Sequence, residues 1–269
     1  MLFNTDYICV MTKYLRIPIA GLLVMFLVSW GYDGHHAVGF IAQRHLSEKA
    51  AAAVKNLLGN DDMADVSSYA DDIKNVAQYK STAALHYFDL PAGLTFEEFQ
   101  TKIKTEKEPN IYQGIGSCIR DLEDPAKSRS QKTFALKLLI HFIGDAHQPM
   151  HVGHTEDRGG NSIAVKFISN STDLHSLWDE GIIQHQNLKY KDFAAKFDDA
   201  TPEQIKRWQS DNVVIWLWES YQIATILYQE AAENTSFDEE YYKTHLPIVK
   251  SRIEKAGIRL AGVLNDIYK

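Results

Sequence analysis

Apolar residues recur at helical spacing along most of this chain, and this periodicity limits the fold more than any other feature. Ser47 precedes one such segment as an N-cap, and Gly59 follows it as a stop signal. Pro247 is expected to bend or interrupt the last segment. The sequence predicts helices over 37–46, 48–58, 65–79, 95–104, 111–122, 133–146, 202–232 and 238–268.

One stretch, 162–168, has the β-branched residues and partial alternation of a strand. It follows the turn-forming sequence Arg158-Gly159-Gly160-Asn161. The length of 269 residues and the 45% hydrophobic content suit one large domain or two small ones, and no linker divides the chain. We therefore expect a mainly α fold, a single-domain helical bundle with a small β-hairpin excursion.

The first 29 residues have the pattern of a signal peptide rather than of a folded segment. Lys13 and Arg16 form a basic region, residues 17–28 are apolar, and the small Ser29 precedes Trp30. The apolar run is short for a membrane span, although a retained N-terminal anchor is the alternative. We expect a signal peptide over 1–29, a mature domain over 30–269, and a secreted or periplasmic protein without stable membrane association after cleavage.

The charge and the cysteines exclude two common arrangements. The net charge is −7, whereas a protein that binds phosphates through its own side chains is normally basic. Any chemistry on a polyanion must take its positive charge from elsewhere, and bound metal is the obvious source. Cys9 and Cys118 are the only cysteines, and Cys9 lies in the predicted leader, so the mature chain forms no internal disulfide.

Histidines and aspartates occur at metal-ligand spacings inside apolar segments. His141 and Asp145 are four residues apart in a predicted helix, so both project from one face, and His175 and Asp179 repeat that spacing. One such pair is usually a helix ion pair, and an isolated histidine is usually a hydrogen-bonded core residue. The number of these residues favours a metal centre. The candidates are His35, Asp71, His86, His141, Asp145, His151, His175 and Asp179.

Imidazole and carboxylate ligands without thiolates suit a hydrolytic zinc site better than a structural one. A single mononuclear site cannot use all eight candidates. Two further histidines, His147 and His154, lie close to them in the sequence, and we interpret these as supporting or surface groups. We expect ordinary structural roles for the remaining histidines: His36, His45, His185 and His245.

An ordered set of motifs carries a family resemblance over most of the mature chain. The motifs are WGYDGH (30–35), SYADD (68–72), LHYFD (85–89), HFIGDAHQPMH (141–151), GGN (159–161) and LHSLWD (174–179). WES (218–220) and RLA (259–261) also fit. The chain resembles the zinc-dependent, single-strand-specific nucleases and 3′-nucleotidases of the S1/P1 type.

The resemblance implies a phospholipase C/nuclease-like helical fold with three zinc ions in a cleft. The implied ligands of the first ion are Asp71, His86, His141 and Asp145. The implied ligands of the second are His35, Asp145 and the free α-amine and carbonyl of Trp30, so that Asp145 bridges two ions. The implied ligands of the third are His151, His175 and Asp179.

The resemblance also implies the substrate contacts and the reaction. Tyr87 would stack on a nucleobase, and Asp89 would accept hydrogen bonds from the edge of that base. Lys74 and Asn161 would contact phosphate and, together with Asp71 and Asp145, serve catalysis. The implied substrates are single-stranded DNA and RNA, cleaved to 5′-mononucleotides, and 3′-nucleotides, and no protein partner is implied. Fungal and plant members of the family carry disulfides, which this mature chain cannot form.

Three alternatives stay open at the level of sequence. A zinc-dependent phospholipase C shares the fold and metal ligands, but it usually has Glu at the position of Asp179 and lacks the long interval between His151 and His175. A zinc scavenger without turnover would keep the ligands and not the activity. A purely structural bundle would leave unexplained why so many histidines and aspartates lie inside apolar helices.

Overall fold

The computed structural model describes residues 31–269, so the predicted leader and Trp30 lie outside the described residues. The helices of the amino-terminal half are α1 (Gly31–Arg44), α2 (Glu48–Leu58), α3 (Tyr69–Ile73), α4 (Phe96–Thr105), α5 (Ile111–Glu123) and α6 (Arg129–Asp145). Those of the other half are α7 (Leu174–Ser176), α8 (Ile182–His185), α9 (Tyr190–Phe197), α10 (Pro202–Ser210), α11 (Val213–Glu233) and α12 (Glu239–Ile267). Three 3₁₀ segments, η1 (Ala77–His86), η2 (Pro149–Val152) and η3 (Thr155–Asp157), and one π-helical turn, η4 (Leu177–Gly181), lie between them.

Side-chain caps explain where several of these helices begin. Ser47 accepts a hydrogen bond from the backbone N–H of Ala50 at the start of α2, as its position before that helix predicts. Helices α4, α6 and α10 each begin with a capping box, in which the cap and the third residue of the helix satisfy each other's backbone N–H groups. These local signals fix the helix starts without help from the core.

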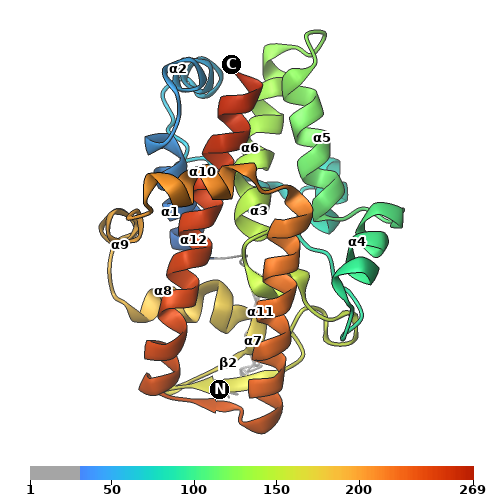
Figure 1. Ribbon diagram of the computed structural model, residues 1–269, viewed down its shortest axis with the longest axis vertical. Helices are drawn as coiled ribbons and strands as arrows, with labels where there is room; N and C mark the ends of the chain where they lie inside the picture. The colour runs from blue at the N-terminus through green and yellow to red at the C-terminus, as the bar shows by residue number, and fades with distance from the viewer. Residues whose placement is uncertain (1–30) are drawn as a thin grey trace, which may run out of the picture.

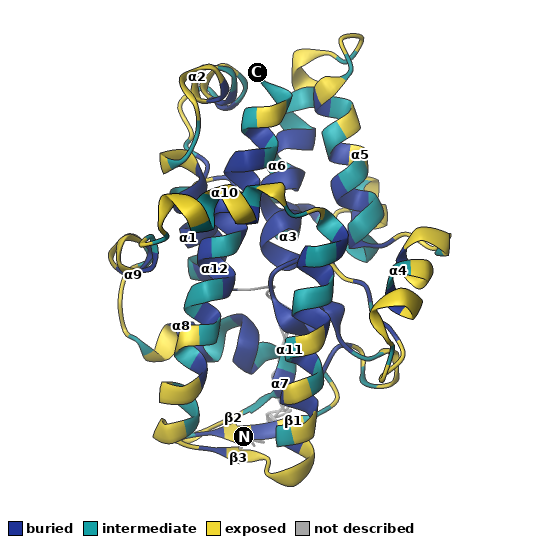
Figure 2. Cartoon of the chain, in the orientation of Figure 1, coloured by how far each residue is buried: buried dark blue, intermediate teal, exposed yellow. Residues whose placement is uncertain are grey.

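The carboxyl-terminal part of α6 forms the centre of the molecule. Helices α1 and α12 pack against each other and against α6, and α5 packs along α6 as well (Figure 1). Residues Leu138–Asp145 of α6 are all buried, so this helix is covered on every side. Figure 2 shows the carboxyl-terminal part of α6 buried, whereas α2, α4 and α9 turn exposed faces outward. The predicted ligands His141 and Asp145 therefore lie in the best-packed part of the fold.

A small sheet lies at one end of the bundle and confirms the expected β excursion. Strand β1 (Ala164–Phe167) pairs antiparallel with β2 (Asn170–Asp173), with Val165 opposite Thr172. A third strand, β3 (Ser236–Phe237), pairs parallel with β1, so the order is β2-β1-β3. The sequence did not predict β3, because a strand of two residues shows no alternation. The mainly α, single-domain fold class is confirmed.

Three of the predicted helices are wrong in extent, and the first of them, predicted over 37–46, begins six residues earlier, at Gly31. Within 65–79 only α3 is α-helical, because Asp62 and Asp65 each accept a hydrogen bond from the other's backbone N–H and hold the preceding segment in a turn. The helix predicted over 202–232 is two helices. Asn212 accepts a hydrogen bond from the backbone N–H of Ile215 and so caps α11, which starts as a separate helix.

Pro247 was predicted to bend or interrupt the last helix, and it does not interrupt it. It lies inside α12, which continues to Ile267. The residues that follow are buried against α1 and α6, and this packing outweighs the loss of one backbone hydrogen bond. Helix α9 and the short helices α7 and α8 were not predicted, because segments of three to eight residues show too little periodicity.

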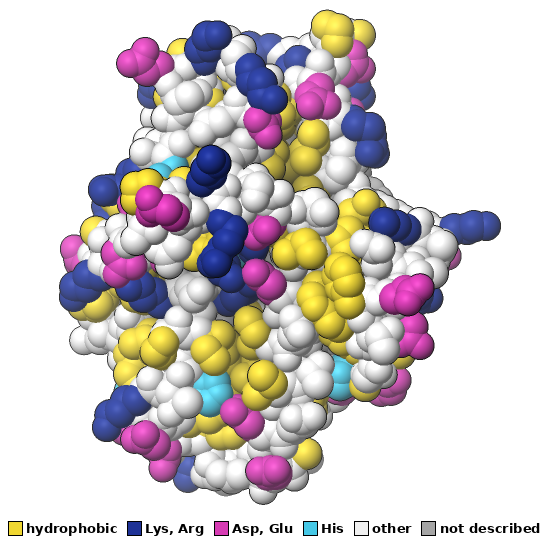
Figure 3. Space-filling view, viewed as in Figure 1, with side chains coloured by type: hydrophobic (Ala, Val, Ile, Leu, Met, Phe, Trp, Pro, Cys, Tyr) yellow, Lys and Arg dark blue, Asp and Glu magenta, His cyan; other side chains and the backbone are white. Residues whose placement is uncertain are grey.

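None of the helices in residues 31–269 combines the length and the apolar character needed to cross a bilayer. Figure 3 shows acidic and basic side chains intermixed over one face of the molecule, in keeping with the modest net charge of −7.

Candidate metal centre

Seven helical elements bring the eight described candidate ligands together at the carboxyl end of α6. Asp71 comes from α3, and His141 and Asp145 come from successive turns of α6. Asp179 comes from the π-helical turn η4, a rare element that often occurs at functional sites. The others are His35 from α1, His86 from the end of η1, His151 from η2 and His175 from α7.

Asp145 lies at the middle of the cluster and is completely buried. Its carboxylate oxygens lie within 3.5 Å of ring nitrogens from four histidines: His35 at 3.3 Å, His86 at 3.1 Å, His141 at 3.1 Å and His151 at 3.5 Å. Burial by itself would raise the pKa of Asp145, but His141 and His151 outweigh that effect and hold it well below the usual range. This carboxylate is therefore ionised and is placed to bridge two cations.

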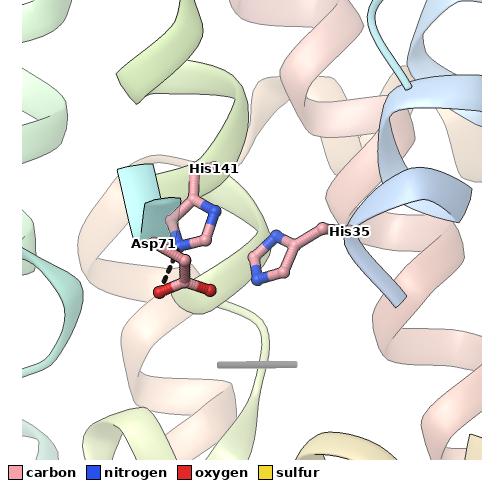
Figure 4. Close-up of side chains that lie close together, drawn as sticks. All are labelled: His35, Asp71 and His141. Carbon is pink, nitrogen blue, oxygen red and sulfur yellow. Dashed lines mark ion pairs between the residues drawn. The ribbon is translucent and has the colours of Figure 1, made fainter. Parts of the chain in front are cut away.

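Two groups of possible metal ligands lie at the carboxyl-terminal end of α6, and they have His141 in common. The first group is His86, His141 and Asp145, and the second is His35, Asp71 and His141, with the ligand atoms of each group within 4.8 Å of one another. Figure 4 shows His35 approaching from α1 toward His141 and Asp71, with an Nε2-to-Oδ1 distance of 3.7 Å between the latter two. Burial, followed by the charge of His141, lowers the pKa of His35 to about 4, so its ring is neutral and has a lone pair for a metal.

A third group lies on the other side of Asp145. His151, His175 and Asp179 converge, with Asp179 oxygens 3.5 Å from His151 Nε2 and 3.1 Å from His175 Nε2. Asp179 is completely buried, and its Oδ2 accepts no hydrogen bond from the described residues. Burial would lower the pKa of His151, but Asp145 and Asp179 outweigh it and raise that pKa to about 9, which shows how strongly this site attracts positive charge.

Backbone carbonyls orient three of the histidines toward the cluster. The Nδ1–H of each ring donates to a carbonyl oxygen at 2.7 Å, which turns Nε2 of each ring toward the carboxylates. The pairs are His141 with Ser67, His151 with His86, and His175 with Gly159. Buried imidazoles of fixed tautomer, ionised carboxylates and no thiolate form a donor set that fits zinc or a similar divalent metal.

The four predicted substrate-contacting residues line one cleft beside these groups. The cleft has a volume of about 350 Å³, and His86, His151 and His175 form its floor together with Met150. Tyr87 is 45% exposed at its edge, so one face of its ring is open to a ligand. The residues predicted to contact substrate are Lys74, Tyr87, Asp89 and Asn161, and all four line the cleft.

Electrostatics within the cleft differ from residue to residue. The Nζ atom of Lys74 lies 2.7 Å from Asp71 Oδ1, so this cation is anchored beside the metal groups. Burial raises the pKa of Asp89 to about 6, and the nearby His151 and His175 oppose that rise. At neutral pH Asp89 is therefore mostly ionised and can accept hydrogen bonds. Asn161 donates its own amide to the carbonyl of Arg158 at 2.7 Å.

Sequence reasoning missed Arg158 as a cleft residue. This arginine lines the same cleft as Asn161 and adopts a left-handed backbone with φ of 58°. The following glycine permits a close approach, because a Cβ on Gly159 would lie 2.5 Å from the carbonyl of Met150 and 3.1 Å from Asp89 Oδ1. The Arg-Gly-Gly-Asn turn was visible in the sequence, but it gave no sign that its arginine faces the metal groups.

A second layer of polar residues fixes the segment between α6 and η2. His147, predicted to be a supporting group, is buried, and its two ring nitrogens contact the carbonyl of Ile143 and Arg259 Nη1. Arg252 donates to the carbonyl of His147 at 2.9 Å, and Ser220 donates to that of Ala146 at 2.7 Å. The chain between Asp145 and His151 is therefore held from behind by α11 and α12.

The other histidines lie outside the three groups. His154 stacks on Tyr228 with ring centroids 3.8 Å apart, and His36 lies 4.9 Å from the ring of Tyr190. Three more are paired with surface carboxylates: His45 with Asp198, His185 with Glu239, and His245 with Glu230.

The chain as a whole is similar to known proteins. The family model described as S1/P1 nuclease matches residues 30–269. The chain is 32% identical to Endonuclease 4 of Arabidopsis thaliana, over 95% of this chain and 94% of that protein. It is 28% identical to Nuclease S1 of Aspergillus oryzae, over 96% of this chain and 98% of that protein, and 26% identical to Nuclease P1 of Penicillium citrinum, over 89% and 98%. The chain belongs to the S1/P1 nuclease family.

Proposed function

We propose that this protein is a secreted, zinc-dependent nuclease that hydrolyses single-stranded DNA and RNA to 5′-mononucleotides and also acts on 3′-nucleotides. The observation that carries the proposal is the convergence of buried histidines and aspartates around Asp145, directly beside a cleft with an exposed aromatic ring. Family membership and the names of the nuclease relatives support the same assignment.

Three zinc ions account for the whole donor set. We assign one to Asp71, His86, His141 and Asp145, and another to His151, His175 and Asp179. The remaining ion takes His35, Asp145 and the α-amine and carbonyl of Trp30, which lies outside the described residues. Zinc in such sites supplies a nucleophilic hydroxide near neutral pH and stabilises negative charge on phosphate oxygens.

The residues of the chain itself bind and orient the substrate. Lys74 and Asn161, which both line the cleft, are suited to hold phosphate oxygens, and the ion pair of Lys74 with Asp71 fixes that ammonium group close to the metal groups. The ring of Tyr87 offers a face on which a base stacks. The ionised carboxylate of Asp89 accepts hydrogen bonds from amino and imino groups at the base edge.

This arrangement gives a physical reason for single-strand preference. A base in a duplex is stacked on both faces and paired along its edge, so it can reach neither the ring of Tyr87 nor the carboxylate of Asp89 without being extruded. The extrusion costs a few kcal/mol per base in a duplex and much less in a single strand. Discrimination between single-stranded and duplex substrates therefore comes from base binding in the cleft. The cleavage chemistry itself would be the same for single strands and duplexes.

Secretion is part of the proposal and is linked to the metal centre. A free α-amine has a pKa near 8, so a zinc ion can displace its proton, whereas a peptide nitrogen has no available lone pair. Removal of residues 1–29 would therefore complete the ligand set at Trp30. The enzyme would become active only after export.

The test compares substrates with the purified, zinc-loaded protein that begins at Trp30. We expect rapid cleavage of single-stranded DNA and RNA, slow cleavage of duplex DNA, and release of phosphate from 3′-nucleotides. Phosphatidylcholine serves as the control substrate for a phospholipase C, and we expect no hydrolysis of it. Hydrolysis of the lipid without cleavage of the oligonucleotides would overturn the proposed function, and so would zinc binding without any turnover.

A further inference from the structure

A second groove lies beside the metal cleft, on the surface between α3, η1, α5 and α6. It is shallow and broad, with a volume of about 1030 Å³ against about 350 Å³ for the cleft. A nucleotide-sized ligand occupies several hundred Å³, so the groove has room for at least one nucleotide. None of the residues assigned to the metal centre lines it. Its floor is made by three aromatic side chains: Tyr69, Tyr79 and Phe134.

These aromatic rings form a stepped platform. The rings of Tyr79 and Phe134 lie 5.4 Å apart at 30°, and Tyr69 meets the edge of Phe134 at 6.2 Å and 87°. All three side chains are partly buried against the core and partly open to the groove. Bases of a single strand stack on such platforms irrespective of their sequence, because every base has a π face.

Two cations flank the platform, and neither forms an ion pair with a carboxylate of residues 31–269. Lys137 Nζ lies 4.8 Å above the ring of Tyr69, and Arg129 donates its guanidinium to the backbone carbonyl of Asn56. The one carboxylate in the lining, Asp121, lies 2.9 Å from Lys127 Nζ and is neutralised by it. On a chain with net charge −7, two uncompensated cations beside aromatic rings are suited to phosphates.

One exposed segment of the chain links the metal cleft to the groove. Lys74 lines the cleft, Gln78 and Tyr79 line the groove, and the chain between them is exposed. Phe134 in the groove also precedes His141 of the metal groups by seven residues of α6, a distance of about 10 Å along the helix axis. A strand of several nucleotides with one phosphate at the metal groups can thus extend from the cleft to the groove.

We propose that this groove is an extended binding site for single-stranded nucleic acid, in which bases stack on Tyr79 and Phe134 while Lys137 and Arg129 hold phosphates. The inference rests on the proposed nuclease function and adds to it. It implies that long substrates bind more tightly than short ones, because a dinucleotide fills only the metal cleft.

The experiment compares KM for a dinucleotide and for a single strand of about 12 nucleotides, using the zinc-loaded enzyme. We expect Tyr79→Ala and Lys137→Gln each to raise KM for the long strand, by about tenfold for Tyr79→Ala, and to leave dinucleotide hydrolysis unchanged. Tyr79→Phe keeps the ring and should behave as wild type. Lys206→Gln, an exposed lysine of α10 far from both sites in the sequence, is the charge control.

Salt dependence gives a second measure that packing defects would not alter. Lys137→Gln should reduce the slope of log KM against log salt concentration by about 0.7 for the long strand, and Lys206→Gln should not change it. Parallel losses on both substrates would mean that these residues only support the fold, and equal KM values for both substrates in the wild type would also overturn the inference. Failure of the wild type to cleave either substrate would instead refute the proposed function.

Discussion

The substitution Gly144→Ala distinguishes an effect on helix stability from an effect on the position of the metal ligand His35. Gly144 lies in the interior of α6, where alanine ordinarily stabilises a helix by about 1 kcal/mol. Here a Cβ would lie 2.7 Å from Nδ1 and 2.9 Å from Cε1 of His35. Because ordinary contacts begin near 3.4 Å, the His35 ring must retreat by about 0.7 Å. That exceeds the tolerance of about 0.5 Å within which a functional group keeps its geometry.

The expected result is a nearly unchanged or slightly lowered stability together with a damaged metal site. Overpacking of this kind costs about 1–3 kcal/mol, which offsets the gain in propensity and leaves a net loss of about 0–2 kcal/mol. Hydrolysis at limiting zinc should fall by about 10- to 100-fold, the size of effect seen when a ligand's positioning is disturbed. Thermal melting of the metal-free protein and activity during a zinc titration measure the two effects separately.

Gly116→Ala is the matched control. Gly116 also lies inside a helix, α5, but a Cβ there meets only the flexible end of Arg120 at 3.3 Å. We expect a gain of about 0.5–1 kcal/mol, a Tm higher by about 1–4 °C, and unchanged activity. If Gly144→Ala also raised Tm and kept full zinc affinity, the placement of His35 against α6, and with it the second metal group, would be refuted.

Three further predictions concern single groups of the site. Asp145→Asn should abolish hydrolysis and lower the zinc content more than His141→Ala does, because Asp145 contacts four histidines. Retention of full metal content by Asp145→Asn in elemental analysis would show that Asp145 does not bridge two ions. Tyr87→Ala should raise KM by about 5- to 100-fold, from a stacking loss of ~1–3 kcal/mol, with little change in kcat, and a collapsed kcat at constant KM would contradict a stacking role. A protein that keeps a few residues ahead of Trp30 should bind less zinc and be nearly inactive, whereas equal activity of the extended and mature forms would show that the free amine is no ligand.

The sequence correctly predicted the helices whose ends are marked by local capping residues. Ser47 and Gly59 mark the ends of α2 in the sequence and in the structure, because caps act on neighbouring backbone groups. The errors arose where tertiary packing, or a turn held by side-chain hydrogen bonds, determines the local structure. Pro247 is tolerated because of what the rest of α12 buries, and the turn of Asp62 and Asp65 competes with a helix that the apolar pattern favoured.

The candidate site was predictable for a different reason. Its residues are chemically distinctive, so His86 or Asp179 attracted attention even though nothing local shows which groups they meet. What the sequence could not reveal was the setting of those residues. The carbonyl of Ser67 that orients His141 and the position of Arg158 in the cleft both depend on segments distant in the chain. The residues Tyr69, Phe134 and Lys137 of the second groove read as ordinary helix positions until α3 and α6 pack together.

The most direct test of the metal centre is a zinc titration of the chelated, mature protein, with zinc binding and cleavage of a single-stranded oligonucleotide followed in the same samples. The account predicts no cleavage without metal, binding of about three zinc ions per chain, and full activity only as the last of them binds. Cleavage by the metal-free protein would contradict it, and so would full activity with one zinc ion per chain.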